Sequence, residues 1–270
     1  AAPAFTTPFH NELLKGVRDR LENVEVDLLI CDLNKETPER TLRDFLARGM
    51  IDGLLLVGVA AEGSLLAELN RTKGPIVLVG TEHPAFDSFH WNDEYGAKRA
   101  TSHLLESDHT PAGMISGPLS GLVDTHRLQG YRETLEANGH SFSSSRVVHT
   151  RSGTQNGHSE EAGYEAMQEL LCANPSLSGV FAGSDVLAIG AWRALREAGR
   201  QVPNDCALVG YDDIKVSQYL GLSSVSQGMK SVGYDAVDLL MRRTNGWAGA
   251  SGSTRIRPEL QIRWSSAPSH

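Results

Sequence analysis

Short apolar runs alternate with amphipathic helical segments along most of the 270 residues, and this alternation constrains the fold more than any other feature. The runs that predict buried strands are VDLLICDL (26–33), GLLLVGV (53–59), PIVLVG (75–80), AGMISG (112–117), RVVHT (146–150), GVFAG (179–183) and ALVGY (207–211). Strands that alternate with helices form βαβ units and parallel sheets. These strands are too many for one compact sheet of this length, so the sequence predicts two sheets in two α/β subdomains.

The segments between these runs carry helix signals. Thr37 and Pro38 predict the start of a helix, and Gly49 predicts its end. Further helices are expected at residues 93–106, 160–171 and 185–198, and another that carries Leu128, Tyr131 and Leu135 should end at Gly139. The late segment RIRPELQIRW (255–264) contains a proline, which predicts a strand at the edge of a sheet.

Composition excludes several classes of protein. Hydrophobic residues make up 40% of the chain and charged residues 21%, so a packed core is expected. The formal net charge of −8 argues against binding DNA or an anionic membrane over a broad surface. The sequence has no apolar run of about 20 residues, which is the length of a membrane span. Cys31, Cys172 and Cys206 form no C-x-x-C pair, which predicts reduced thiols and a cytoplasmic location.

The sequence lacks the motifs of the common enzyme classes. It has no G-x-S-x-G nucleophile elbow, no phosphate-binding G-x-x-x-x-G-K-[ST] loop and no G-x-G-x-x-G dinucleotide fingerprint. The ten histidines lack the helical i,i+4 spacing or the cysteine partners that zinc sites use. We therefore expect a protein that is not an enzyme and that binds no metal or cofactor.

Polar side chains follow several predicted strands. In open parallel sheets, ligands bind beyond the carboxyl ends of the strands. The residues placed there are Asp32, Ser116, Ser184, Asp185 and Asp212. In GYDDI, strand alternation should send Asp212 and Asp213 to opposite faces, which disfavours a catalytic pair of carboxylates. We expect Asp212 to face a ligand and Asp213 to hold the turn.

The stretch GVFAGSDVLAIGAWRALREAGRQVPNDCALVGYDDIKVSQYLGLSSVSQ (179–227) resembles the effector-binding core of the lactose/galactose-repressor (LacI/GalR) family. Further similarity lies in TTPFHNELLKGV (6–17), WNDEYGAKRATSHLLESDH (91–109), RLQGYRETLEANG (127–139) and RPELQIRWSS (257–266). The resemblance covers nearly the whole chain. The family's helix-turn-helix headpiece and hinge helix are not matched, and its first strand is reduced to AAPAF (1–5), so we expect a segment upstream.

The resemblance implies a periplasmic binding protein-like fold of type I, with two Rossmann-like parallel-sheet subdomains joined by three crossovers. The N-terminal subdomain would comprise residues 1–108 and 227–252, and the C-terminal subdomain residues 109–226 and 253–270. A ligand would bind in the cleft between them.

The resemblance also implies the residues of an effector site. Arg127 and Asp212 match the family's effector-contacting Arg and Asp, Phe9 matches a cleft aromatic, and Met229 matches an apolar cleft position. Three positions depart from the family: Ser184 replaces its usual Asn, Asn92 its usual Asp, and His158 its usual aromatic. An Arg fork and a carboxylate can each hold two adjacent sugar hydroxyls. Trp91 and His90 either line the cleft or pack between subdomains.

The function implied is that of the effector-sensing domain of a cytoplasmic transcriptional regulator. The effector would be a sugar or sugar derivative, and operator DNA would be bound only through the missing headpiece. A homodimer is expected, with the helices at residues 65–69 and 234–241 as candidate interfaces. The alternatives are a periplasmic sugar-binding protein of a transporter and, more remotely, an α/β hydrolase or dehydrogenase.

Overall fold

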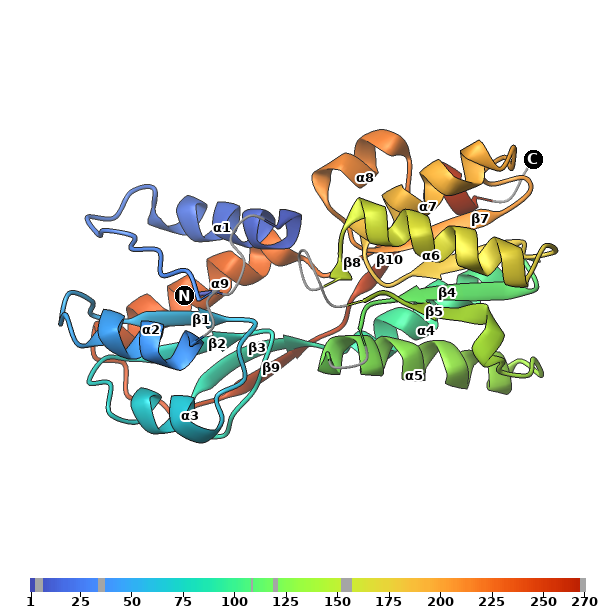
Figure 1. Ribbon diagram of the computed structural model, residues 1–270. Helices are drawn as coiled ribbons and strands as arrows, with labels where there is room; N and C mark the ends of the chain where they lie inside the picture. The colour runs from blue at the N-terminus through green and yellow to red at the C-terminus, as the bar shows by residue number, and fades with distance from the viewer. Residues whose placement is uncertain (3–6, 34–36, 108, 119–120, 152–156, 268–270) are drawn as a thin grey trace. The chain divides into compact units, whose positions relative to one another are not determined.

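The computed structural model describes residues 1–2, 7–33, 37–107, 109–118, 121–151 and 157–267 (Figure 1). Its chain divides into two compact units. Unit 1 comprises Ala1–Trp91 and Gly228–Ile256, and unit 2 comprises Asn92–Gln227 and Arg257–His270. The chain therefore passes from one unit to the other at three points, after Trp91, Gln227 and Ile256.

This division differs from the expected boundaries at two places. Helix α4 (Asp93–Glu106) was expected in the first subdomain, but it packs on helix α5 (Leu122–Ala137) within unit 2. Strand β9 (Ser253–Ile256) was expected in the second subdomain, but it pairs with β3 (Asp87–Trp91) in unit 1. The packing partner of each element decides its unit, and the sequence of the element alone does not specify that partner.

Unit 1 is built on a four-stranded sheet in the order β1-β2-β3-β9, and all of its neighbouring strands are parallel. The two strands not yet defined are β1 (Leu54–Val57) and β2 (Ile76–Val79). Its helices are α1 (Pro8–Leu21), α2 (Pro38–Leu46), α3 (Gly63–Leu69) and α9 (Met229–Thr244). Alternate residues of β2 enter two different apolar clusters, one with α1 and α9 and one with α2 and α3. The sheet is therefore covered on both faces, as parallel sheets require.

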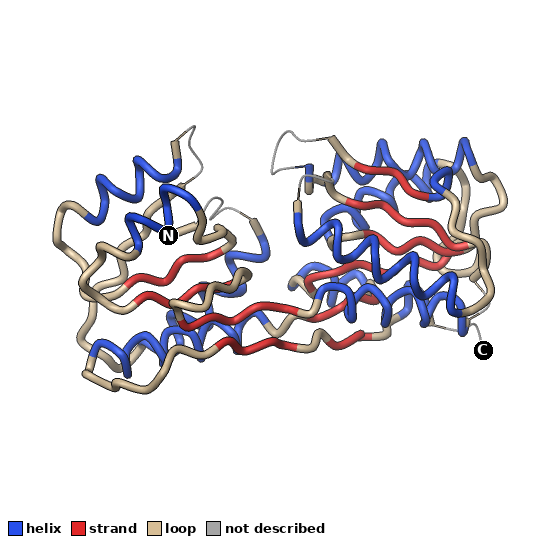
Figure 2. Tube along the Cα trace, turned by 90° about the horizontal axis from the view of Figure 1, so that it is seen from below, coloured by secondary structure: helices blue, strands red, loops and turns tan. Residues whose placement is uncertain are grey.

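Unit 2 is built on a six-stranded sheet in the order β10-β8-β7-β6-β4-β5. Its strands are β4 (Ala112–Ser116), β5 (Val147–His149), β6 (Gly179–Ala182), β7 (Ala207–Asp212), β8 (Ser223–Ser226) and β10 (Glu259–Gln261). Five of them are parallel, and β10 alone runs antiparallel, on β8. Figure 2 shows the strands of each unit lying side by side among helices.

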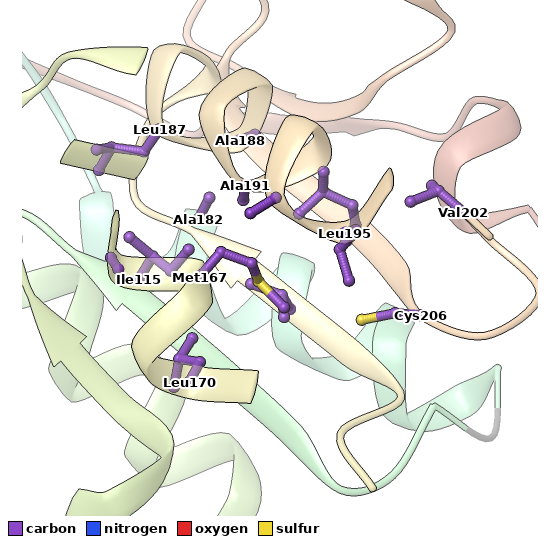
Figure 3. Packing of buried hydrophobic residues seen from close by; sticks show 14 of the residues in the cluster. Ile115, Met167, Leu170, Ala182, Leu187, Ala188, Ala191, Leu195, Val202 and Cys206 are labelled. Carbon is purple, nitrogen blue, oxygen red and sulfur yellow. The ribbon is translucent and has the colours of Figure 1, made fainter. Parts of the chain in front are cut away.

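The helices of unit 2 cover both faces of its sheet. Helices α4 and α5 share an apolar cluster with Met114, Phe181 and Val209. The other face is covered by α6 (Glu160–Ala173) and α7 (Asp185–Glu197). Figure 3 shows side chains of these two helices, such as Met167 and Leu195, pointing toward those of the sheet. A short helix, α8 (Lys215–Leu220), follows β7.

Helices α6 and α7 approach each other closely through glycine. A Cβ on Gly163 would meet the carbonyl oxygen of Leu187, and one on Gly190 would meet that of Glu160. Each glycine thus faces the backbone of the opposite helix, where no side chain fits. This close contact positions the start of α7, where Ser184 and Asp185 lie, against α6.

The predicted α/β class with parallel sheets is confirmed, but the predicted strand at residues 26–33 is wrong. Among the described residues, its only pairing is an isolated bridge between Asp32 and Ala2. Four of its apolar side chains are exposed: Val26 (49%), Leu28 (46%), Leu29 (42%) and Ile30 (55%). An apolar run forms a buried strand only where neighbouring strands pair with its backbone. The shortened first strand expected at residues 1–5 falls largely on residues 3–6, outside the described residues.

The late strand predicted around Pro258 is in fact two strands. The chain breaks at Arg257 and Pro258, with β9 before and β10 after them. Each lies at an edge of a different sheet, β9 in unit 1 and β10 in unit 2. The expected position at a sheet edge is therefore confirmed. The expectation of one continuous strand is wrong, because proline cannot donate to a strand ladder and the chain passes from unit 1 to unit 2 there.

Two further expectations concern membranes and thiols. Within the described part of the chain, no helix combines the length and apolar character that a membrane crossing demands. All three cysteines are free, with Cys31 and Cys206 buried and Cys172 exposed.

The close contact of α6 and α7 leads to a stability prediction. Gly190→Ala should lower the free energy of unfolding by about 1–3 kcal/mol, because the added methyl group forces two helix backbones apart. Gly252→Ala is the control, since a Cβ there meets nothing within 4 Å, and it should stay within about 0.5 kcal/mol of wild type. Chemical denaturation measures both. If Gly190→Ala were as stable as wild type, the helices would not be in contact.

Candidate functional site

Polar side chains gather at the carboxyl edge of the sheet in unit 2. Strand β4 lies between β5 and β6, so the chain adds strands first on one side of β4 and then on the other. Such a reversal opens a crevice beyond the strand ends, where open α/β sheets bind ligands. Ser116 ends β4, Ser184 follows β6, and Asp212 ends β7. We call the polar groups at this edge the unit 2 site.

Arg127 lies at the centre of the unit 2 site. It projects from α5 and is 5% exposed. Its Nε and Nη2 donate to Asp93 Oδ1 at 2.9 and 2.8 Å, and its Nη1 donates to the carbonyl oxygen of Gly183 at 2.5 Å. The guanidinium carbon lies 3.6 Å from the centre of the Tyr211 ring, a cation–π contact. Burial alone would lower the pKa of Arg127, but the charge of Asp93 raises it overall, so this residue stays charged.

Asp212 lies beside Arg127. Its Oδ1 is 4.0 Å from Arg127 Nη2 and accepts a hydrogen bond of 2.6 Å from Gln227 Nε2. No donor among the described residues reaches Asp212 Oδ2 within hydrogen-bond distance. Burial raises the pKa of Asp212 to about 6, against the opposing effect of Arg127. The protein therefore offsets the negative charge of Asp212 only in part, and the carboxylate can accept a hydrogen bond from a ligand.

Asp213 has a different set of partners. Its carboxylate accepts from Arg263 Nη2 at 2.6 Å, and its backbone N–H donates to Ser224 Oγ at 3.0 Å. The reason is not strand alternation, because Asp212 and Asp213 both leave the extended conformation, with φ of 104° and 54°. Two successive non-glycine residues with positive φ are strained and persist only where the surroundings hold them. Here the hydrogen bonds from Gln227 to Asp212 and from Arg263 to Asp213 hold the two residues in place.

Ser184 and Asp185 begin helix α7. Ser184 Oγ accepts from the backbone N–H of Leu187 at 3.3 Å and thereby caps the helix. Asp185 is fully buried. Its carboxylate accepts from Ile214 N, Ser217 Oγ and Ser224 Oγ, at 2.9, 2.7 and 2.6 Å. Burial raises the pKa of Asp185 to about 7. Asp185 thus holds the turn after β7, whereas Ser184 caps the helix.

His158 and Asp124 form a pair that the sequence analysis did not identify. His158 Nε2 lies 3.4 Å from Asp124 Oδ2, and its Nδ1 lies 3.2 Å from Ser184 Oγ. Asp124 Oδ1 accepts from the backbone N–H of Gly117 at 3.0 Å. Burial opposes ionisation of Asp124, but His158, Arg127 and Gly117 together lower its pKa. Asp124 precedes Arg127 by three residues, so helical spacing from Arg127 could have identified it.

Asn92 and Asp93 divide the role expected of Asn92 alone. Asn92 Oδ1 accepts from the backbone N–H of Tyr95 at 3.2 Å and caps α4. Asp93 holds Arg127 instead. An acid directly after an N-cap is common in helices, so Asp93 could not be told from a solvated first-turn residue by sequence.

The expected residues of unit 1 lie in one apolar cluster. Met229 and Trp91 are 4% and 7% exposed, and half-buried Phe9 packs against the same cluster. The ring centres of Phe9 and Trp91 are 5.7 Å apart at an interplanar angle of 74°. His90 points to the other face of β3, with its Nδ1 3.2 Å from Ser253 Oγ. The structure therefore groups Phe9, Trp91 and Met229 and leaves His90 apart from them.

The remaining strand-end residues differ in their surroundings. Asp32 is exposed in unit 1, in the segment that does not form the expected strand. Ser116 is fully buried in the unit 2 site. In the described part of the chain, no three His, Cys, Asp or Glu side chains are placed to hold a metal ion.

Comparisons with known proteins place the chain in a family. Residues 101–266 match the model of the periplasmic binding protein-like domain. The chain is 30% identical to the HTH-type transcriptional regulator CelR of Thermobifida fusca, over 96% of this chain and 76% of that protein. It is also 30% identical to the HTH-type transcriptional repressor CytR of Escherichia coli K12, over 97% of this chain and 77% of the repressor.

Solved structures give the same result. The structure of the transcriptional regulator CelR in complex with cellobiose superposes with a TM-score of 0.84 at 29% identity. The match covers 97% of this chain and 80% of the CelR chain. Because the matched relatives are regulators, the transporter alternative is disfavoured. The chain belongs to the LacI family of transcriptional regulators and forms the periplasmic-binding-protein-like, effector-sensing domain of that family.

Proposed function

We propose that the chain senses a sugar or sugar derivative at the unit 2 site, and that binding alters the operator affinity of a regulator that acts in the cytoplasm. The observation that carries this proposal is the pair of Arg127 and Asp212. Arg127 is held rigidly by Asp93 and Gly183, and Asp212 keeps one carboxylate oxygen without a donor from the described residues. Hydroxyl groups of a sugar can donate hydrogen bonds to that oxygen and accept hydrogen bonds from the remaining N–H groups of Arg127.

The family comparison supports the same class of effector. The regulator CelR, which shares the fold and 29% of its sequence with this chain, has been solved with cellobiose. Of the expected effector residues, Arg127, His158, Ser184, Asp212 and Asn92 lie at or beside the unit 2 site. The other two expected residues, Phe9 and Met229, belong to the apolar cluster of unit 1.

A hydrolase is the rival function that one observation favours. His158 lies between Asp124 and Ser184, which resembles the order of a Ser-His-Asp triad. However, Ser184 is 3% exposed and its hydroxyl is used to cap α7. A nucleophilic serine must reach a substrate and be activated by its histidine. We therefore propose binding without catalysis.

We also propose that the chain forms a homodimer, as the family membership implies, since two-fold dimers are the commonest assemblies. The two helices expected at the interface use many apolar side chains within unit 1. Leu65, Leu69 and Val237 are 5%, 1% and 5% exposed. Tyr234, on the second of these helices, is 44% exposed. In unit 2, Tyr219 on α8 and Trp264 offer further apolar surface, at 78% and 56% exposure.

The dimer is tested by static light scattering. At micromolar concentration we expect twice the chain mass of 29.2 kDa. A Tyr219→Asp variant should shift the mass toward the monomer if α8 contributes, because it places a charge in an apolar contact. A mass of one chain for the wild-type protein would contradict the dimer.

The roles of the two acids in GYDDI can be separated by mutation. Asp212→Asn should weaken binding of the identified effector by at least about 10-fold, since it removes a charged hydrogen-bond acceptor. The same change should stabilise the empty protein at pH 7.5 by about 1–3 kcal/mol, because burial raises the pKa of Asp212 to about 6 and ionisation above that pH costs the fold stability. This gain should vanish as the pH falls from 6 toward 4.

Asp213→Asn is the matched control. It removes the same charge one residue away and weakens the contact with Arg263. It should lower the free energy of unfolding by about 1–2 kcal/mol and leave effector affinity within about two-fold of wild type. Titration calorimetry and pH-dependent denaturation measure these effects. Wild-type affinity in Asp212→Asn would show that Asp212 only shapes the turn.

A further inference from the structure

We propose that the unit 2 site selects an uncharged or cationic polyol and rejects anionic relatives of it, such as sugar phosphates and sugar acids. This inference rests on the proposed sugar-binding function and narrows it. It follows from the charges that the site already holds. Asp93, Asp124 and Asp212 bring three carboxylates around the single guanidinium of Arg127. His158 adds at most one further positive charge.

Arg127 is not free to bind an anion. A phosphate or carboxylate group is normally held by two parallel N–H groups of an arginine fork. In this site Nε and Nη2 donate to Asp93, Nη1 donates to Gly183, and one face of the guanidinium lies on Tyr211. The N–H groups that remain can serve a hydroxyl oxygen. An anion placed there would also lie near Asp212, whose Oδ1 is 4.0 Å from Nη2.

The positive amino ends of the helices at this edge also lie beside negative charges of the protein. The amino ends of helices attract anions through their free N–H groups and their dipoles. Three helices begin at or beside the site, and each has an aspartate in its first turn: Asp93 in α4, Asp124 in α5 and Asp185 in α7. These carboxylates put a negative charge in the first turn of each helix, where it opposes the positive end of the helix dipole. The attraction of the helix ends for a ligand anion is therefore weakened by the protein.

Three other cationic side chains of unit 2 do not offset the negative charge of the unit 2 site. Arg263 is paired with Asp213 at 2.6 Å, and Lys215 Nζ lies 5.2 Å from the ring of Tyr219 on α8. Arg151, after β5, is exposed to water, which screens its charge.

Two uncharged hydroxyl groups are also buried at this edge of the sheet. Ser116 Oγ and Thr150 Oγ1 are buried at the ends of β4 and β5, and neither has a hydrogen-bond partner among the described residues. Hydroxyl groups both donate and accept, so they suit the hydroxyls of a polyol. The site thus combines neutral hydrogen-bonding groups with an excess of negative charge.

The test uses matched pairs of probes on the whole chain. The pairs are cellobiose with cellobionate, ribose with ribose 5-phosphate, and glucose with glucose 6-phosphate, with glucosamine as a cationic member. Thermal shift identifies the pairs of which at least one member binds. Titration calorimetry then gives the dissociation constant of each member. In every pair that binds, the anionic member should bind at least about 30-fold more weakly than the neutral one, because like charges repel across a few ångströms of a poorly solvated site.

Variants test whether the site charge causes the discrimination. Asp124→Asn removes one carboxylate but keeps an acceptor for the N–H of Gly117. It should reduce the neutral-to-anion ratio by about 3- to 10-fold. Glu169→Gln makes the same change in charge at an exposed position on α6 and should leave the ratio unchanged.

The possible failures are distinct. An anionic member that binds as tightly as its neutral partner would overturn the charge selection while leaving the proposed sugar sensing intact. An equal loss of discrimination in Asp124→Asn and Glu169→Gln would overturn the assignment of the discrimination to this site. Failure of every probe, charged and neutral, to bind would overturn the sugar-sensing function and this inference with it.

Discussion

The contact of Arg127 with Asp93, Gly183 and Tyr211 organises the unit 2 site. It joins α5 to the first residue of α4, to the end of β6 and to the aromatic ring of β7. A buried guanidinium is stable only where its charge and its N–H groups are matched. For the same reason Arg127→Ala is a poor test of binding, because it leaves Asp93 buried without its partner, a change that typically costs about 3–5 kcal/mol. Effector recognition must therefore build on an arginine that the fold already requires.

Much of the fold could be predicted from apolar periodicity, since β1, β2, β4, β6 and β7 all coincide with short apolar runs. Strands were predicted wrongly where an apolar run has no neighbouring strand, or where a paired strand is polar. Residues 26–33 are apolar but have no neighbouring strands among the described residues, apart from the bridge at Asp32. Strands β3 (DSFHW) and β8 (SSVS) are polar yet paired on both sides, so no apolar run predicted them. Strand partners are a property of the assembled sheet, which local sequence does not encode.

Strand ends and the family resemblance both pointed to Asp212 and Ser184, whereas the resemblance alone pointed to Arg127. Asp93 and Asp124 were missed because an acid in the first turn of a helix is common and carries no functional signal of its own. Their importance follows from burial beside Arg127. The division of labour between Asp212 and Asp213 was expected from strand alternation, but positive φ at both residues produces it instead.

A crystal structure of the chain with a bound sugar, chosen by thermal shift, tests most directly whether Asp212 and Arg127 hold the effector. We expect a ligand hydroxyl within hydrogen-bond distance of Asp212 Oδ2, with Arg127 still held by Asp93 and donating a remaining N–H group to the same ligand. A sugar bound elsewhere, or one that leaves both Asp212 and Arg127 without a ligand contact, would contradict the assignment of the effector site to this edge of the sheet.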